Sequence, residues 1–120
     1  MTAHGSLATG GIIYHYTDKT GYQAIIAVSD WNFRARHPRH PRKPHGAYFT
    51  TLPPDTNNLA ERIGVSKMKT RYFFSFTDSG DLHPLNARRP VRFQVKLYYP
   101  DDYLVTVERQ CQHGENPLWT

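Results

Sequence analysis

The chain has little of what defines several large protein classes. Cys111 is its only cysteine, so no internal disulfide can form and a reducing compartment is compatible with the sequence. No apolar stretch is long enough to span a bilayer, and the first ten residues lack the charged start and apolar run of a secretory signal. We therefore expect a soluble protein without a disulfide partner. It is compatible with a cytoplasmic location, but the compartment stays open.

Two kinds of ligand site are also missing from the sequence. It contains no glycine-rich phosphate-binding loop of the Rossmann or P-loop kind. His37, His40 and His45 would be candidate zinc ligands, but prolines separate them and no cysteine or carboxylate is close. We therefore expect no metal. Cys111 follows a strand, and we expect an inert, half-buried thiol there rather than a nucleophile.

What the chain does have is aromatic and basic residues. Aromatic residues make up 13% of the 120 residues against 38% hydrophobic in total, so we expect the core to depend on Phe, Tyr and Trp packing. Nine prolines and eight glycines favour short strands joined by turns. The net charge of +5 suits an anionic partner such as a dinucleotide, RNA or an acidic protein surface.

The sequence pattern predicts one α+β domain over residues 12–120, preceded by a flexible tail or expression remnant at 1–11. A first helix should begin at Asp18 or Thr20 and end near Ala27, with Tyr22, Ile25 and Ile26 buried. A second should follow a cap at Asp55 or Thr56 and end at Gly64. Loops are expected over 34–45 and 78–89. Strands are expected at 12–16, 31–33, 47–51, 71–77, 91–97 and 103–107, the last of these being the final strand.

Three segments carry a recognisable pattern. The first, Tyr14–Ile26, begins Tyr-His-Tyr-Thr-Asp-Lys-Thr-Gly-Tyr; the second is Gly46–Pro54, which begins Gly-Ala-Tyr-Phe-Thr; the third is Tyr99–Val105, Tyr-Pro-Asp-Asp-Tyr-Leu-Val. This order of histidine, tyrosine and acid resembles the ADP-ribosyltransferase superfamily, and specifically its small toxin-like family named for a His-Tyr-Asp signature. The segments also align with those of the poly(ADP-ribose) polymerases. One difference is that no aromatic residue stands between Thr51 and Arg71, where the polymerases have a second tyrosine.

The resemblance implies a fold and a site. The fold would be two packed, mainly antiparallel sheets that form an NAD cleft, with short helices at the side. His15 would hydrogen-bond ribose hydroxyls, Tyr48 would stack on the nicotinamide, and Asp102 would stabilise the ribosyl cation. The residues implied to bind NAD are His15, Tyr16, Thr17, Gly46, Tyr48 and, from the basic loop at 34–45, Arg36.

These groups match the chemistry of the reaction. Cleavage of the bond between nicotinamide and ribose passes through an oxocarbenium-like cation, as glycoside cleavage does. The protein must therefore hold the leaving ring, orient the ribose and place negative charge near the developing positive centre. Glu108 remains a rival to Asp102 as the acid. The basic loop is either a solvated, mobile segment or a contact to pyrophosphate or to a nucleic-acid acceptor.

The function implied is mono-ADP-ribosyl transfer from NAD to a protein or nucleic-acid acceptor. The compartment stays open, and the cytoplasm of the producing cell or of a target cell is compatible with the sequence. The first alternative is an NAD glycohydrolase that uses the same site with water as the acceptor. The second is a catalytically silent module that binds RNA or ADP-ribose through its positive charge.

Overall fold

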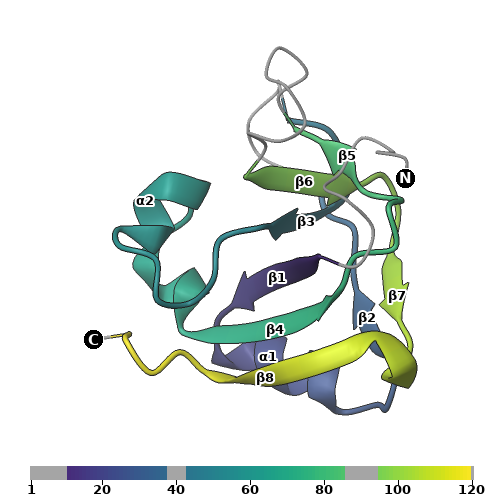
Figure 1. Cartoon of the computed structure of the whole chain (residues 1–120), viewed down its shortest axis with the longest axis horizontal. Helices are drawn as coiled ribbons and strands as arrows, with labels where there is room; N and C mark the ends of the chain where they lie inside the picture. Colours follow the sequence, from purple (N-terminus) through teal and green to yellow (C-terminus); the bar gives the residue numbers. More distant parts are fainter. Residues whose placement is uncertain (1–10, 38–42, 86–94, 120) are drawn as a thin grey trace.

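The computed structural model describes residues 11–37, 43–85 and 95–119. Its strands form a six-stranded sheet in the order β5-β6-β3-β1-β4-β8 and a two-stranded sheet of β2 and β7 (Figure 1). Every pairing between these named strands is antiparallel. The strands are β1 (Ile12–Thr17), β2 (Trp31–Phe33), β3 (Ala47–Thr50), β4 (Tyr72–Thr77), β5 (His83–Pro84), β6 (Lys96–Tyr99), β7 (Tyr103–Val105) and β8 (Gln110–Glu115). The α+β class with mainly antiparallel sheets is confirmed.

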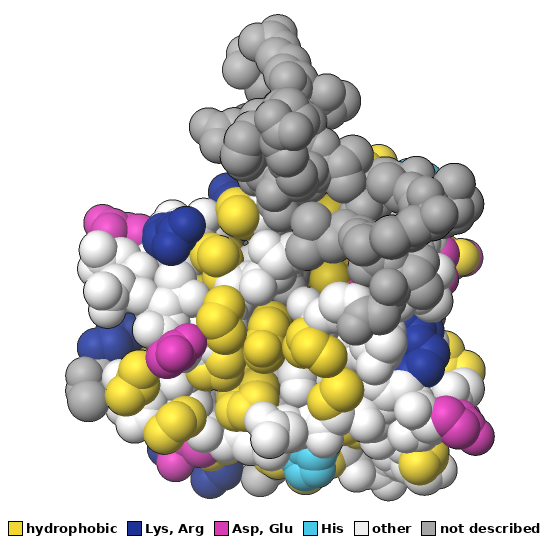
Figure 2. Space-filling view, in the orientation of Figure 1, with side chains coloured by type: hydrophobic (Ala, Val, Ile, Leu, Met, Phe, Trp, Pro, Cys, Tyr) yellow, Lys and Arg dark blue, Asp and Glu magenta, His cyan; other side chains and the backbone are white. Residues whose placement is uncertain are grey.

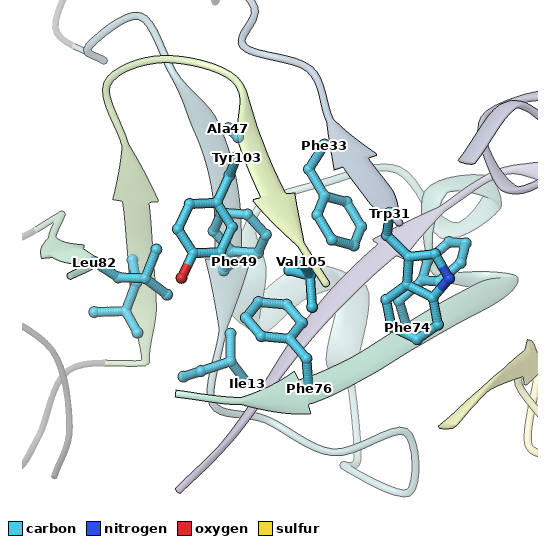
Figure 3. Close-up of a cluster of buried hydrophobic side chains, with 11 residues drawn as sticks. Ile13, Trp31, Phe33, Ala47, Phe49, Phe74, Phe76, Leu82, Tyr103 and Val105 are labelled. Atoms are coloured by element: carbon cyan, nitrogen blue, oxygen red, sulfur yellow. The ribbon is translucent and has the colours of Figure 1, made fainter. Parts of the chain in front are cut away.

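The space between the two sheets is filled by aromatic side chains (Figure 3). Phe33 of β2 lies at the centre, with ring centroids 5.4 Å from Phe49, 5.6 Å from Phe74 and 5.8 Å from Phe76. Because rings of this size bury a large apolar area in a few residues, a chain with modest hydrophobic content can still form a packed core. The expected aromatic core is confirmed.

Helix α1 (Lys19–Ile26) begins as predicted, because Asp18 caps it by accepting a hydrogen bond from the Gly21 amide at 2.9 Å. Tyr22 and Ile25 pack against the core, but Ile26 is 40% exposed, so its predicted burial is wrong. The helix is only eight residues long and turns a narrow side toward the sheet.

Helix α2 (Leu59–Ile63) begins later than predicted. Its N-cap is Asn58, in the left-handed region at φ 56°, rather than Asp55 or Thr56. Thr56 instead closes a turn by donating to the Pro53 carbonyl. The predicted end at Gly64 is confirmed: this residue has φ 76°, a conformation that glycine adopts without steric cost. A 3₁₀-helix, η1 (Lys67–Thr70), then leads into β4.

The last part of the chain differs most from expectation. The predicted final strand ends at Val105, and the 3₁₀-helix η3 (Val107–Arg109) follows it. Strand β8 was not predicted, because Gln-Cys-Gln-His-Gly-Glu has no alternation of apolar residues; its backbone pairing with β4 makes it a strand. Cys111 lies in β8 and is exposed, which corrects the expected half-buried thiol.

Other differences concern the loops. Strand β5 falls within the stretch 78–89, which was expected to be a loop. Of the strand expected at 91–97, only the last part lies in the described residues, as the start of β6. The tail at 1–10 and the centre of the basic loop lie outside the described residues. In the described ranges, no helix has the length and apolar character needed to cross a membrane.

The aromatic core generates the first testable expectation. Phe76→Ala should lower the free energy of unfolding by about 3–5 kcal/mol, because Phe76 is fully buried and its removal leaves a cavity. Leu104→Ala on β7 is the control: this side chain is 53% exposed, so the loss should stay below about 1 kcal/mol. Urea unfolding measures both values, and equal losses would contradict the placement of Phe76.

Candidate functional site

His15 occupies the middle of β1 and faces the core. Its ring centroid lies 4.6 Å from that of Phe33 and 5.6 Å from that of Phe49. Its Nδ1 lies 2.9 Å from the backbone carbonyl oxygen of Tyr48 on the neighbouring strand β3. The first predicted motif is therefore joined to the second by a direct hydrogen bond across 33 residues of sequence.

The surroundings of this histidine determine its charge. Burial, reinforced by the positive charges of Arg36 and Lys69, lowers the pKa of His15 to about 4, although the bond to the Tyr48 carbonyl acts in the opposite direction. The imidazole is therefore neutral at pH 7. Because a carbonyl can only accept, Nδ1 carries the proton and Nε2 carries a lone pair that can accept a hydrogen bond from a hydroxyl.

The Tyr48 ring lies on the opposite face of the sheet. In the antiparallel register Tyr14 faces Thr50, so Tyr16 faces Tyr48 while His15 faces Phe49. The Tyr48 hydroxyl donates to the Pro44 carbonyl, and burial raises the pKa of this phenol. His15 therefore contacts the backbone of Tyr48 from the core face, and the tyrosine ring is presented on the outer face.

A cavity of about 130 Å³ lies on this outer face, over the hydrogen-bonded strands β1, β3 and β6. Figure 2 shows hydrophobic side chains gathered on this face of the molecule, beside α2. The volume suits a single ring rather than a whole dinucleotide. The cavity is lined by Tyr14, His15, Tyr16, Lys43, Tyr48, Phe49, Thr50, Ile63, Val65, Leu85, Lys96 and Leu97.

This position corrects the predicted cleft. The space between the two sheets is occupied by the core, and β1 and β3 are paired directly, so a ligand cannot enter between them. The cavity beside Tyr48 instead has the sheet as its floor. Ile63 and Val65, on either side of Gly64, line it from the end of α2.

Several lining residues were not predicted from the sequence. Ile63, Val65, Leu85 and Lys96 join the cavity from segments that carry no motif. The alternation of Lys96 with buried Leu97 places Lys96 on the outer face, and this was the one available signal. Ile63 and Val65 line the cavity because of the turn at Gly64. The sequence predicted that a helix ends there, but no periodicity predicts that the two side chains lie over the sheet.

Gly46 and Arg36 meet at the start of β3. Their backbones form an isolated antiparallel bridge, with N–O distances of 3.0 and 3.1 Å. A Cβ added to Gly46 would lie 2.3 Å from the Tyr99 carbonyl oxygen, so glycine is required by close packing. Arg36 is exposed, and its charge acts on His15. Neither residue lines the cavity, although both lie beside the strand that presents Tyr48.

Tyr16 and Thr17 have different surroundings. Tyr16 lines the cavity and donates its hydroxyl to the Leu52 carbonyl at 2.7 Å; burial strongly raises the pKa of this phenol. Thr17 is buried at the end of β1 and does not line the cavity. A Cβ on Gly21 would lie 2.0 Å from the Thr17 hydroxyl oxygen, so this threonine lies where α1 approaches β1 most closely.

The two candidate acids lie at opposite ends of β7. Asp102 precedes the strand, and its Oδ1 accepts a hydrogen bond from the Ala35 amide at 2.7 Å. Tyr103, the next residue, pairs with Phe33, the residue against which His15 packs. Glu108 lies in η3, beyond the pairing of Val105 with Trp31. Asp102 is therefore at the His15 end of β7, and neither acid lines the cavity.

Within the described residues, no group of three or more His, Cys, Asp or Glu side chains is arranged to hold a metal ion. No family model matches the sequence, and no curated protein or solved structure shows significant similarity to the chain.

The lowered pKa of His15 has a measurable consequence. The unfolded chain binds a proton at this residue below about pH 6.5, and the folded chain does so only below about pH 4. Stability from His15 should therefore be complete above pH 6.5 and should fall as the pH drops toward 4. His15→Asn should show a shallower decline over this window in urea unfolding, because it removes the titrating group. A His15 imidazole that titrates near 6.5 by NMR would contradict this account.

The close approach at Gly46 predicts a loss of stability. Gly46→Ala should lower the free energy of unfolding by about 1–3 kcal/mol, since the added methyl group meets a backbone carbonyl that cannot move independently. Ala24→Gly provides a comparison on an exposed position of α1, where the cost is about 1 kcal/mol from helix propensity alone. A Gly46→Ala protein as stable as the unmodified chain would overturn the packing role.

Proposed function

We propose that this chain transfers a single ADP-ribosyl group from NAD to a protein or nucleic-acid acceptor. The observation that carries the proposal is the hydrogen bond from His15 to the Tyr48 carbonyl. It brings the two most specific parts of the His-Tyr-acid pattern into contact, beside a cavity of single-ring size. The ADP-ribosyltransferase type of the fold belongs to the same proposal.

The reaction breaks the bond between the nicotinamide nitrogen and ribose C1′. Both bonding electrons leave with the nicotinamide, which becomes neutral, and positive charge develops on the ribose. The acceptor then forms a bond to C1′ and loses a proton. No redox step is involved, so the chain needs to hold the ring, orient the ribose and stabilise positive charge.

The cavity supplies the first of these functions. Its volume of about 130 Å³ suits the nicotinamide ring, with Tyr48 as the stacking surface and Ile63 and Val65 as the facing wall. The ribose and the pyrophosphate then lie outside the cavity.

His15 supports the binding of the ring from the core face of the sheet. Its Nδ1–H bond fixes the backbone beneath the Tyr48 ring and so positions the stacking surface. A neutral imidazole suits this role, because it can lie among the core rings without burying a charge. Arg36 places a positive charge near His15, where it would attract the pyrophosphate.

Asp102 is the acid that the arrangement favours. It lies at the end of β7 next to the Phe33–Tyr103 pair, and His15 packs on Phe33. Its carboxylate is exposed and accepts a hydrogen bond from the Ala35 amide, which orients its negative charge. Glu108 is separated from His15 by the length of β7.

The experiment compares matched substitutions at the two acids. Asp102→Asn keeps the acceptor for the Ala35 amide but removes the negative charge, and turnover of NAD should fall by about 10²-fold or more. NAD affinity should change far less, because the interaction strengthens as charge develops on the ribose. Release of nicotinamide and labelling of macromolecules with radioactive NAD measure the two products.

Glu108→Gln is the control and should leave turnover near that of the unmodified chain. Loss of activity in Glu108→Gln but not in Asp102→Asn would reassign the acid. Nicotinamide release without labelled macromolecule would show hydrolysis in place of transfer. An unmodified chain that neither binds NAD nor releases nicotinamide would refute the proposed function.

A further inference from the structure

The outer face of the large sheet carries one aromatic side chain per strand in a row across five strands. Phe73 of β4 pairs with Tyr16 of β1, which the register places opposite Tyr48 of β3. Tyr48 pairs with Tyr98 of β6, which pairs with His83 of β5. Paired residues share a face, so these five rings run perpendicular to the strands.

The part of the row beyond the cavity is continuous. Ring centroids lie 6.3 Å apart for Tyr48 and Tyr98 and 5.5 Å apart for Tyr98 and His83. Tyr98 is half-buried, His83 is exposed, and β5 forms the edge of the sheet. Neither residue lines the cavity, so the row leads from a half-open single-ring site to an exposed aromatic pair.

The charges beside the row are positive. Lys96 and Lys43 both line the cavity, and none of the described residues that line it is a carboxylate. A Cβ added to Gly64 would lie 3.4 Å from Lys96 Nζ, so this ammonium lies at the α2 wall of the cavity. The negative charge of Asp55 acts on Tyr14 and Tyr16, which lie on the β1 side of this face. The cavity is therefore the positively charged part of this face, and a ligand with a phosphate next to its ring suits it.

We infer that Tyr98 and His83 stack the adenine ring of the dinucleotide whose nicotinamide occupies the Tyr48 cavity. This inference rests on the proposed function. Tyr48 and His83 are two strand spacings apart, roughly 10 Å, a span that the ribose–pyrophosphate–ribose linker of a dinucleotide can bridge. Adenine binds aromatic side chains through its π-face, and this needs no sequence motif.

The geometry favours a dinucleotide over single-stranded nucleic acid. A polynucleotide stacks successive bases on open aromatic faces, but the Tyr48 site is a cavity that Ile63 and Val65 also line. One half-open ring site lined by two lysines and one exposed aromatic pair next to it match two bases joined by one pyrophosphate.

The test separates the two halves of the ligand. Tyr98→Ala and His83→Ala are titrated calorimetrically with AMP, with nicotinamide mononucleotide and with NAD. Each substitution should weaken AMP and NAD binding by about 5-fold or more, the range of base–aromatic stacking, and should leave nicotinamide mononucleotide binding unchanged. Tyr98→Phe keeps the ring and should bind like the unmodified chain. His113→Ala, an exposed histidine on the opposite edge strand β8, is the control and should have no effect.

Other outcomes overturn the inference. Equal weakening of AMP and nicotinamide mononucleotide would indicate a general structural effect. Weakened binding of a single-stranded oligonucleotide with unchanged NAD binding would assign the row to nucleic acid. Unchanged AMP binding in both alanine variants, with NAD turnover intact, would refute the adenine site and leave the proposed function standing. AMP binding that depends on Tyr98, in a chain that never binds nicotinamide mononucleotide or cleaves NAD, would refute the proposed function alone.

Discussion

The pairing of β1 with β3 is the constraint on which the site depends. Alternating residues of these strands face the core and the outer surface, so one pairing register places His15 among the core rings and Tyr48 in the cavity. The hydrogen bond from His15 Nδ1 to the Tyr48 carbonyl oxygen stabilises this register from the core face of the sheet. A shift by one residue would exchange the two faces and would bury the tyrosine.

The aromatic core holds this pair in place. Phe33 contacts His15 and three phenylalanines of the large sheet, and through its pairing with Tyr103 it also positions the end of β7. Burial of His15 determines both its charge and its orientation. Burial among rings stabilises the neutral imidazole, and the neutral imidazole donates only through Nδ1, so its orientation is fixed.

The cavity illustrates how a small chain builds a ligand site without a deep cleft. Its floor is the outer surface of the sheet, and its wall comes from two aliphatic residues that a glycine in the left-handed region separates. Only a single ring fits inside, so the rest of a larger ligand must bind on the surface. The aromatic pair of Tyr98 and His83 next to the cavity provides such a surface.

The sequence by itself determined the α+β class, the aromatic core, the Asp18 cap, the Gly64 helix end and most described strands. These features follow from local patterns: alternation, cap residues and residues with special backbone freedom. Strand β8 escaped prediction because its polar residues become a strand only through hydrogen bonds to β4. Likewise, the sequence named His15 and Tyr48, but only the tertiary structure decided that their rings point to opposite faces. The tertiary structure alone brought Ile63, Val65 and Lys96 to the cavity. It also put Asp102, and not Glu108, at the His15 end of β7. Such proximity depends on strand register and on contacts between segments that are far apart in sequence.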